Sequence, residues 1–162
     1  MNGDFVGVAS LKRQQAEQVL EFESWAAHGE WDSFHRSHYD WWAFPVDAPS
    51  QHGFTYALTP DAIETLRHDQ DFLASLRRAA VLLLMSWGRD ARTGKDVEYP
   101  TPAQVWQNWP IRLYKCARSL EIFEQWDLFN VARDYALELI DQGHSFHWNG
   151  RDLADYFRAP AA

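Results

Sequence analysis

The segment Asp69–Trp87, DQDFLASLRRAAVLLLMSW, decides the fold class of this chain. Its apolar residues recur with the spacing of one helix face, at Phe72, Leu76, Ala79 or Ala80, Leu83 and Trp87. The consecutive leucines at 82–84 widen that face, and an aspartate stands where a helix N-cap is expected. The pattern therefore predicts a buried, central helix.

Helical patterns continue on both sides of this segment. Thr59-Pro60 and Thr101-Pro102 each combine an N-cap residue with a proline suited to the first helical position. Strand signals are thin, with weak alternation only at Phe54–Leu58. The expected helices are Ala9–Ala27 capped by Ser10, Trp31–Trp41, Pro60–His68, Ile111–Gln125, Asp127–Gln142 and Arg151–Phe157. We predict an all-α protein, a compact irregular bundle of five to seven helices in a single domain, 1–162.

Composition narrows the class of protein. The chain has 23 acidic and 15 basic residues, a net charge of −8, and it has no long basic run, which disfavours binding to nucleic acid or to an anionic membrane. The longest aliphatic run, Ala79–Met85, is too short to cross a bilayer, and Met1–Gln15 has no apolar stretch typical of a secretory signal. One cysteine excludes an internal disulfide. These features together favour a cytoplasmic location.

A set of short motifs in the middle of the chain suggests a family. They are Tyr39, W-x-F-P at Trp42–Pro45, Leu58-Thr59, Trp87-Gly88, R-L-x-K-x-x-R-S-L at Arg112–Leu120 and Leu137-Glu138. Their order and spacing resemble the conserved N-terminal domain of the opioid growth factor receptor family, which includes uncharacterised bacterial members, over about residues 39–139. The resemblance implies a helical domain with no established enzymatic activity. The family's repetitive tail and basic nuclear-targeting stretches are not among these residues, so we carry over neither nuclear localisation nor opioid peptide binding.

Histidines recur at a spacing that can serve a metal ion. His35 and His38 stand three residues apart, as do His144 and His147, and Asp32 extends the first pair to D-x-x-H-x-x-H. On a helix such residues share a face, and two histidines with a carboxylate suit Zn or Fe. The same pair could also act as a catalytic acid or base. The alternative is that these histidines are surface or hydrogen-bonded side chains beside aromatic residues.

An aromatic run follows the first histidine pair, with Tyr39, Asp40, Trp41 and Trp42 in succession. Aromatic rings beside a carboxylate suit an ammonium group or a planar ring. Adjacent tryptophans cannot share one helix face, so one is expected in the core and the other toward a groove or a partner. The alternative is a core hinge of large residues before Pro45.

Three cations follow one another at helical spacing in the predicted helix after Pro110. Arg112, Lys115 and Arg118 lie on the side opposite the apolar stripe that contains Leu113. They form either a solvated face or an anion site in which arginine grips a carboxylate or phosphate. Asn108 and Trp109 precede them and could line the same place. The nearby Cys116 falls on the apolar face, where a thiol is inert.

These patterns support three functional hypotheses. The first is a soluble helical binding module, with a pocket formed by the aromatic run and the basic helix, for a small aromatic, zwitterionic or anionic molecule or a peptide. The second is a small enzyme that depends on a metal at Asp32, His35 and His38, or on a histidine with Arg112 holding the substrate. The third is a protein-interaction module, in which exposed tryptophans mediate contacts, including contacts within a homo-oligomer. The sequence leaves open whether the protein is an enzyme.

Overall fold

The computed structural model describes residues 4–159 of the chain, and it is mostly helical there, as predicted. Two short antiparallel hairpins, β1 (Arg89–Asp90) with β2 (Lys95–Asp96) and β3 (His147–Trp148) with β4 (Arg151–Asp152), interrupt the helices. The helices of this part are α1 (Val8–Ala27), α2 (Trp31–Arg36), α3 (Asp40–Ala43), α4 (Pro60–Arg67), α5 (Gln70–Ser86), α6 (Pro110–Ile122), α7 (Trp126–Asp141) and α8 (Ala154–Arg158). None of these helices is both long and apolar enough to cross a bilayer.

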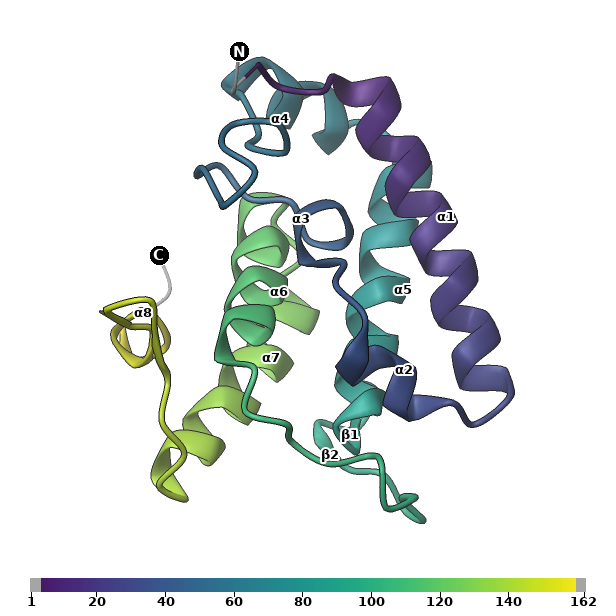
Figure 1. Cartoon of the computed structure of the whole chain (residues 1–162), viewed down its shortest axis with the longest axis vertical. Helices are drawn as coiled ribbons and strands as arrows, with labels where there is room; N and C mark the ends of the chain where they lie inside the picture. The colour runs from purple at the N-terminus through teal and green to yellow at the C-terminus, as the bar shows by residue number, and fades with distance from the viewer. Residues whose placement is uncertain (1–3, 160–162) are drawn as a thin grey trace.

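The longer helices pack in a continuous series across the molecule (Figure 1). Helix α1 lies against α5, α5 contacts both α6 and α7, and α7 contacts the small C-terminal helix α8. The short helices α2 and α3 fill the space between α1 and the neighbouring long helices, α5 and α6. Helix α5 therefore occupies the centre, as its apolar pattern predicted.

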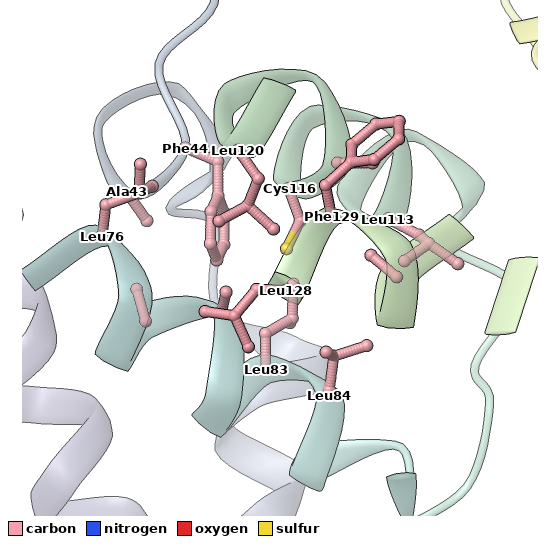
Figure 2. Packing of buried hydrophobic residues seen from close by; sticks show 14 of the residues in the cluster. Ala43, Phe44, Leu76, Leu83, Leu84, Leu113, Cys116, Leu120, Leu128 and Phe129 are labelled. Atoms are coloured by element: carbon pink, nitrogen blue, oxygen red, sulfur yellow. The ribbon is translucent and has the colours of Figure 1, made fainter. Parts of the chain in front are cut away.

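The core is built around the leucines of α5. Leu76, Leu83 and Leu84 are fully buried and meet residues of α6 and α7, such as Cys116 and Leu128, in one cluster (Figure 2). Aliphatic side chains interdigitate there with rings from other elements, such as Phe44 and Phe129. Burial of this continuous apolar surface supplies the main driving force for the fold.

Two of the four predicted helix caps are present, at Thr59 and Asp69. The Thr59 hydroxyl accepts a hydrogen bond from the Ala62 N–H at 3.1 Å, and the Asp69 carboxylate accepts one from Phe72 N–H at the same distance. The predicted cap at Ser10 is wrong, because α1 begins earlier and Gly7, at a φ of 99°, occupies its N-cap position. Side-chain caps thus mark α4 and α5 but not the first helix.

The predicted helix Trp31–Trp41 is wrong as a single element. It divides into α2 and α3, with Ser37 in an extended conformation between them. The carbonyl oxygens of Phe34 and Ser37 accept hydrogen bonds from the Arg112 guanidinium on α6. A tertiary contact therefore satisfies backbone groups at this break, and the described region has eight helices rather than five to seven.

The Thr101-Pro102 signal does not start a helix. The Gln104 side chain accepts a hydrogen bond from Thr101 N–H and donates one to the Met85 carbonyl, which ties this turn to the end of α5. At Gly88, with a φ of 82°, a Cβ would approach the Gln104 carbonyl oxygen to 2.6 Å. The close approach of these two segments requires glycine there. The weak alternation at Phe54–Leu58 also forms no strand.

Candidate ligand-binding site

The aromatic run and the basic helix, far apart in the sequence, meet in the structure. Helix α3 packs against α6, and the Asp40 carboxylate faces the Arg112 guanidinium with 3.2 Å between Oδ1 and Nε. Both side chains are buried, and only 1% of Arg112 is exposed. The two segments therefore lie next to each other as predicted, but Arg112 and Asp40 pair with each other instead of facing a ligand.

Arg112 is held on every side by the protein. Its guanidinium carbon lies 4.6 Å from the ring centroids of both Tyr39 and Trp109, so the cation is sandwiched between two aromatic faces. The same group donates hydrogen bonds to the Tyr39 hydroxyl at 3.2 Å and to the carbonyls of Phe34 and Ser37. With these partners Arg112 ties α6 to the break between α2 and α3, and it is not free to grip an anion. These contacts give no support to the prediction that Arg112 binds a ligand or an anionic substrate, and the burial of Tyr39 gives none to that role for its side chain.

The alternative that the three cations form a solvated face of α6 is wrong for Arg112 and Lys115. Lys115 is only 9% exposed, because α3, α7 and β3 all pack around this helix. Arg118 lies nearer the surface, where it pairs with Asp47 at 3.0 Å and with Glu121 at 2.6 Å. Of the three cations, Lys115 alone has no ion pair among residues 4–159.

Lys115 lines a pocket of about 320 Å³. Residues of the loop 46–51 and of the hairpin of β3 and β4 contribute to its lining. The side chains of Trp41 and Tyr114 face it, together with Trp148 and Arg151 from the hairpin. We call this space the Lys115 pocket. It is large enough for a small organic molecule, at the lower end of the range for such sites.

The charge on Lys115 is poorly compensated. Its ammonium nitrogen lies 5.3 Å from the centroid of the Trp41 ring, and burial lowers its pKa, while the nearby Asp40 opposes that shift. Among the described residues that line the pocket, Asp40 is the one carboxylate, and it already pairs with Arg112. A buried ammonium without a paired anion is costly, and such groups concentrate at functional sites.

Most of the lining of this pocket was not predicted, because only Asp40, Trp41 and Lys115 were among the candidate residues. Tyr114 lies next to Lys115 in the sequence of α6 and was not predicted. The guanidinium carbon of Arg151 lies 5.6 Å from the centroid of the Tyr114 ring. Trp148 and Arg151 belong to the hairpin of β3 and β4, which was not expected. The only signal for that hairpin is Asn149-Gly150, a dipeptide typical of two-residue hairpin turns.

The remaining predicted ligand-binding residues lie around the pocket rather than in it. Trp42 turns toward α1, where its Nε1 donates to the Gln18 side chain at 2.9 Å. Trp109 packs on Arg112 and on Trp148, and Asn108 is an exposed residue with a φ of 60°. The prediction that one of the two adjacent tryptophans enters the core is wrong, because both remain partly exposed, with their ring centroids 5.7 Å apart.

The predicted metal site is not assembled. Within residues 4–159, no three His, Cys, Asp or Glu side chains lie close enough together to hold a metal ion. This finding applies to the predicted set of Asp32, His35 and His38, and also to a site that would combine these two histidines with His144 and His147. His35 is buried, with its Nε2 2.8 Å from the Ala103 carbonyl. His38 lies in the break after α2, against Trp41 and Trp109, so the helical spacing that would align the pair is lost. The structure thus gives the histidine pair no support as Zn or Fe ligands.

We expect His35 to make the stability of the fold sensitive to acid. Burial is the largest cause that lowers the pKa of its imidazole, and the hydrogen bond to Ala103 acts in the opposite direction. As the pH falls, His35 of the unfolded chain therefore binds a proton near pH 6.5, whereas His35 of the folded protein binds one only at lower pH. The stability that the neutral His35 contributes is thus present above that pH and is lost below it. His35→Gln, which can keep the bond to the carbonyl, should lose less unfolding free energy than wild type between about pH 7.5 and pH 5. Parallel urea-denaturation midpoints for the two proteins across this range would contradict the assignment.

The lone cysteine behaves as the sequence indicated. Cys116 is fully buried in the core, and burial raises the pKa of its thiol. It is a packing residue rather than a nucleophile.

No protein-family model, no curated protein and no solved structure matches this chain. The resemblance to the opioid growth factor receptor family therefore stays a prediction.

Proposed function

We propose that this protein is a binding module that takes a small, planar, anionic molecule, such as an aromatic carboxylate, into the Lys115 pocket. The single observation that carries the proposal is the buried Lys115 ammonium, which lies over the Trp41 ring and pairs with no carboxylate in the described residues. An anionic ligand would supply the missing partner. No observation of similar weight favours an enzyme or a protein-interaction module.

The charge of the pocket supports an anion over a cation. Lys115 and Arg151 are the cations that line it, while Asp40 is already compensated by Arg112. The local excess of positive charge stands against a net charge of −8 for the whole chain. Solvent screens the field of the buried Lys115 only weakly, whereas the exposed Arg151 adds a more strongly screened attraction.

The rings around the pocket support a planar ligand over a compact inorganic anion. Trp41, Tyr114 and Trp148 offer aromatic surface, and aliphatic groups such as Ile111 and Val46 complete the lining. An aromatic body would bury apolar area against these side chains, while its carboxylate faces the two cations. Sites for small ligands commonly combine an apolar lining with a few polar groups in this way.

The direct test is a titration with benzoate, nicotinate and indole-3-acetate, followed by intrinsic fluorescence and by thermal unfolding. We expect at least one of these aromatic carboxylates to bind saturably and to raise the Tm. Lys115→Met should weaken that binding by about ten- to a hundredfold, because a hydrogen bond to a charged group contributes about 1.5–3 kcal/mol. The same substitution should leave the Tm of the free protein unchanged or higher, since it removes an uncompensated buried charge.

Lys95→Met is the matched control, because this lysine lies on the exposed strand β2 and does not line the pocket. It should bind the carboxylates as wild type does. Equal affinities of wild type and Lys115→Met, or binding of none of the three probes, would overturn the proposal.

A further inference from the structure

A second pocket, of about 310 Å³, lies at the opposite end of α5 from its N-cap. Its walls come from the residues that follow α5, from the segment 100–106 and from α7. The side chains that define it are Trp87, Arg89, Trp106, Tyr135 and Glu138. We call it the Trp87 pocket. It shares no lining residue with the Lys115 pocket.

Three N–H donors in the walls of the Trp87 pocket lack acceptors. The indole Nε1 groups of Trp87 and Trp106 and the Nε of Arg89 have no hydrogen-bond partner among residues 4–159. The three nitrogen atoms have almost no accessible surface, so an acceptor reaches them only when the side chains around them shift slightly. Buried donors are nearly always paired in native proteins, and three orphans around one pocket indicate that a molecule with acceptor atoms completes it.

The rings of this pocket form one aromatic cluster. The centroids of Trp87 and Trp106 are 4.9 Å apart, and the centroid of Tyr135 lies 6.1 Å from each of them. Phe146 stacks on Trp106 with an interplanar angle of 6°. The walls are therefore largely aromatic and suit the apolar face of a ring.

The charged residues of the Trp87 pocket determine which net charge a bound ring can carry. The Arg89 guanidinium pairs with Glu138 and lies 3.5 Å from Asp96, and it also packs on the Tyr135 ring at 4.6 Å. An anion would meet two carboxylates that already surround the single arginine. A cation without acceptor atoms, such as a quaternary ammonium ion, would leave the orphan N–H groups unpaired.

We propose that the Trp87 pocket binds a neutral, hydroxylated ring of the monosaccharide or cyclitol class. When these side chains shift to admit the ligand, the indole N–H groups of Trp87 and Trp106 donate to its ring or hydroxyl oxygens. Other hydroxyls donate to the rim acceptors Glu138 and Gln142, which line the same pocket. The C–H face of the ring packs on the aromatic walls.

Indole N–H resonances in ¹H–¹⁵N NMR spectra test this proposal directly. The probes are D-glucose, D-galactose and myo-inositol, compared with inorganic phosphate and tetramethylammonium. We expect the indole signals of Trp87 and Trp106 to move saturably with at least one neutral probe, while the signal of Trp126, a partly exposed residue outside the pocket, stays in place. Single Trp→Phe variants assign the three signals.

The binding constant of the best probe then measures the role of the orphan donors. Trp106→Phe should weaken it by about tenfold, which corresponds to one lost hydrogen bond, and Trp126→Phe should not change it. Should Trp106→Phe fail to fold, Glu138→Gln, which keeps the shape of the rim, should still weaken binding. Lys115→Met should leave it intact, which separates this site from the Lys115 pocket. Static indole signals with all three neutral probes, or movement with phosphate or tetramethylammonium alone, would overturn the proposal.

Discussion

Replacing Arg112 by methionine is expected to lower the free energy of unfolding by about 3–5 kcal/mol, because it strands a buried carboxylate. Asp40 would lose its ion-pair partner while remaining 7% exposed, and the carbonyls of Phe34 and Ser37 would lose their donor. The connection between α6 and the break after α2 depends on these contacts. Chemical denaturation monitored by circular dichroism measures the loss.

Arg118→Met provides the matched control, because it removes an arginine from the same helix at a position nearer the surface. Its pairs with Asp47 and Glu121 should contribute about 1 kcal/mol or less. Adding Asp40→Asn to Arg112→Met should recover part of the stability by removing the stranded charge. Similar losses for the two arginine variants would show that the buried network does not stabilise the fold.

Shortening Leu83 to alanine is expected to cost about 2–5 kcal/mol of unfolding free energy, because a cavity remains in the centre of the core. The side chain is fully buried on α5 and belongs to the cluster that joins α5 to α6 and α7 (Figure 2). Thermal unfolding should show a correspondingly lower Tm. The fold should persist, because the other leucines of α5 still face the same cluster.

Leu20→Ala is the control for this prediction. Leu20 lies on α1 and is 71% exposed, so its truncation should change the stability by about 0.5 kcal/mol at most. A cost at Leu83 no larger than the cost at Leu20 would mean that α5 is not the centre of the core.

The two pockets differ in what would complete them. In the Lys115 pocket a buried cation lacks an anion, whereas in the Trp87 pocket neutral donors lack acceptors. Each arrangement reduces the stability of the free protein, and a bound ligand would offset that cost by mass action. The thermal shift produced by each class of probe therefore distinguishes the two sites without any substitution.

The sequence by itself determined the helical class, the central position of α5 and the caps of α4 and α5. These features are local, because apolar periodicity and N-cap hydrogen bonds involve residues at most a few turns apart. Thr59 and Asp69 cap their helices as predicted, and the apolar stripe from Phe72 to Trp87 is buried. The burial of Cys116 follows from the same local pattern.

Only the tertiary structure decided what the charged residues do. Helical spacing placed Arg112 and Lys115 on a face opposite Leu113, but a helix surrounded by α3, α7 and β3 has no solvated face there. Arg112 found its partners in the segment before α3, and in doing so it satisfied the carbonyls that a continuous helix would have used internally. The hairpin that brings Arg151 beside Tyr114 is likewise a long-range contact. Whether a buried charge is paired depends on residues brought together by the packing of distant segments, and spacing along one helix does not contain that information.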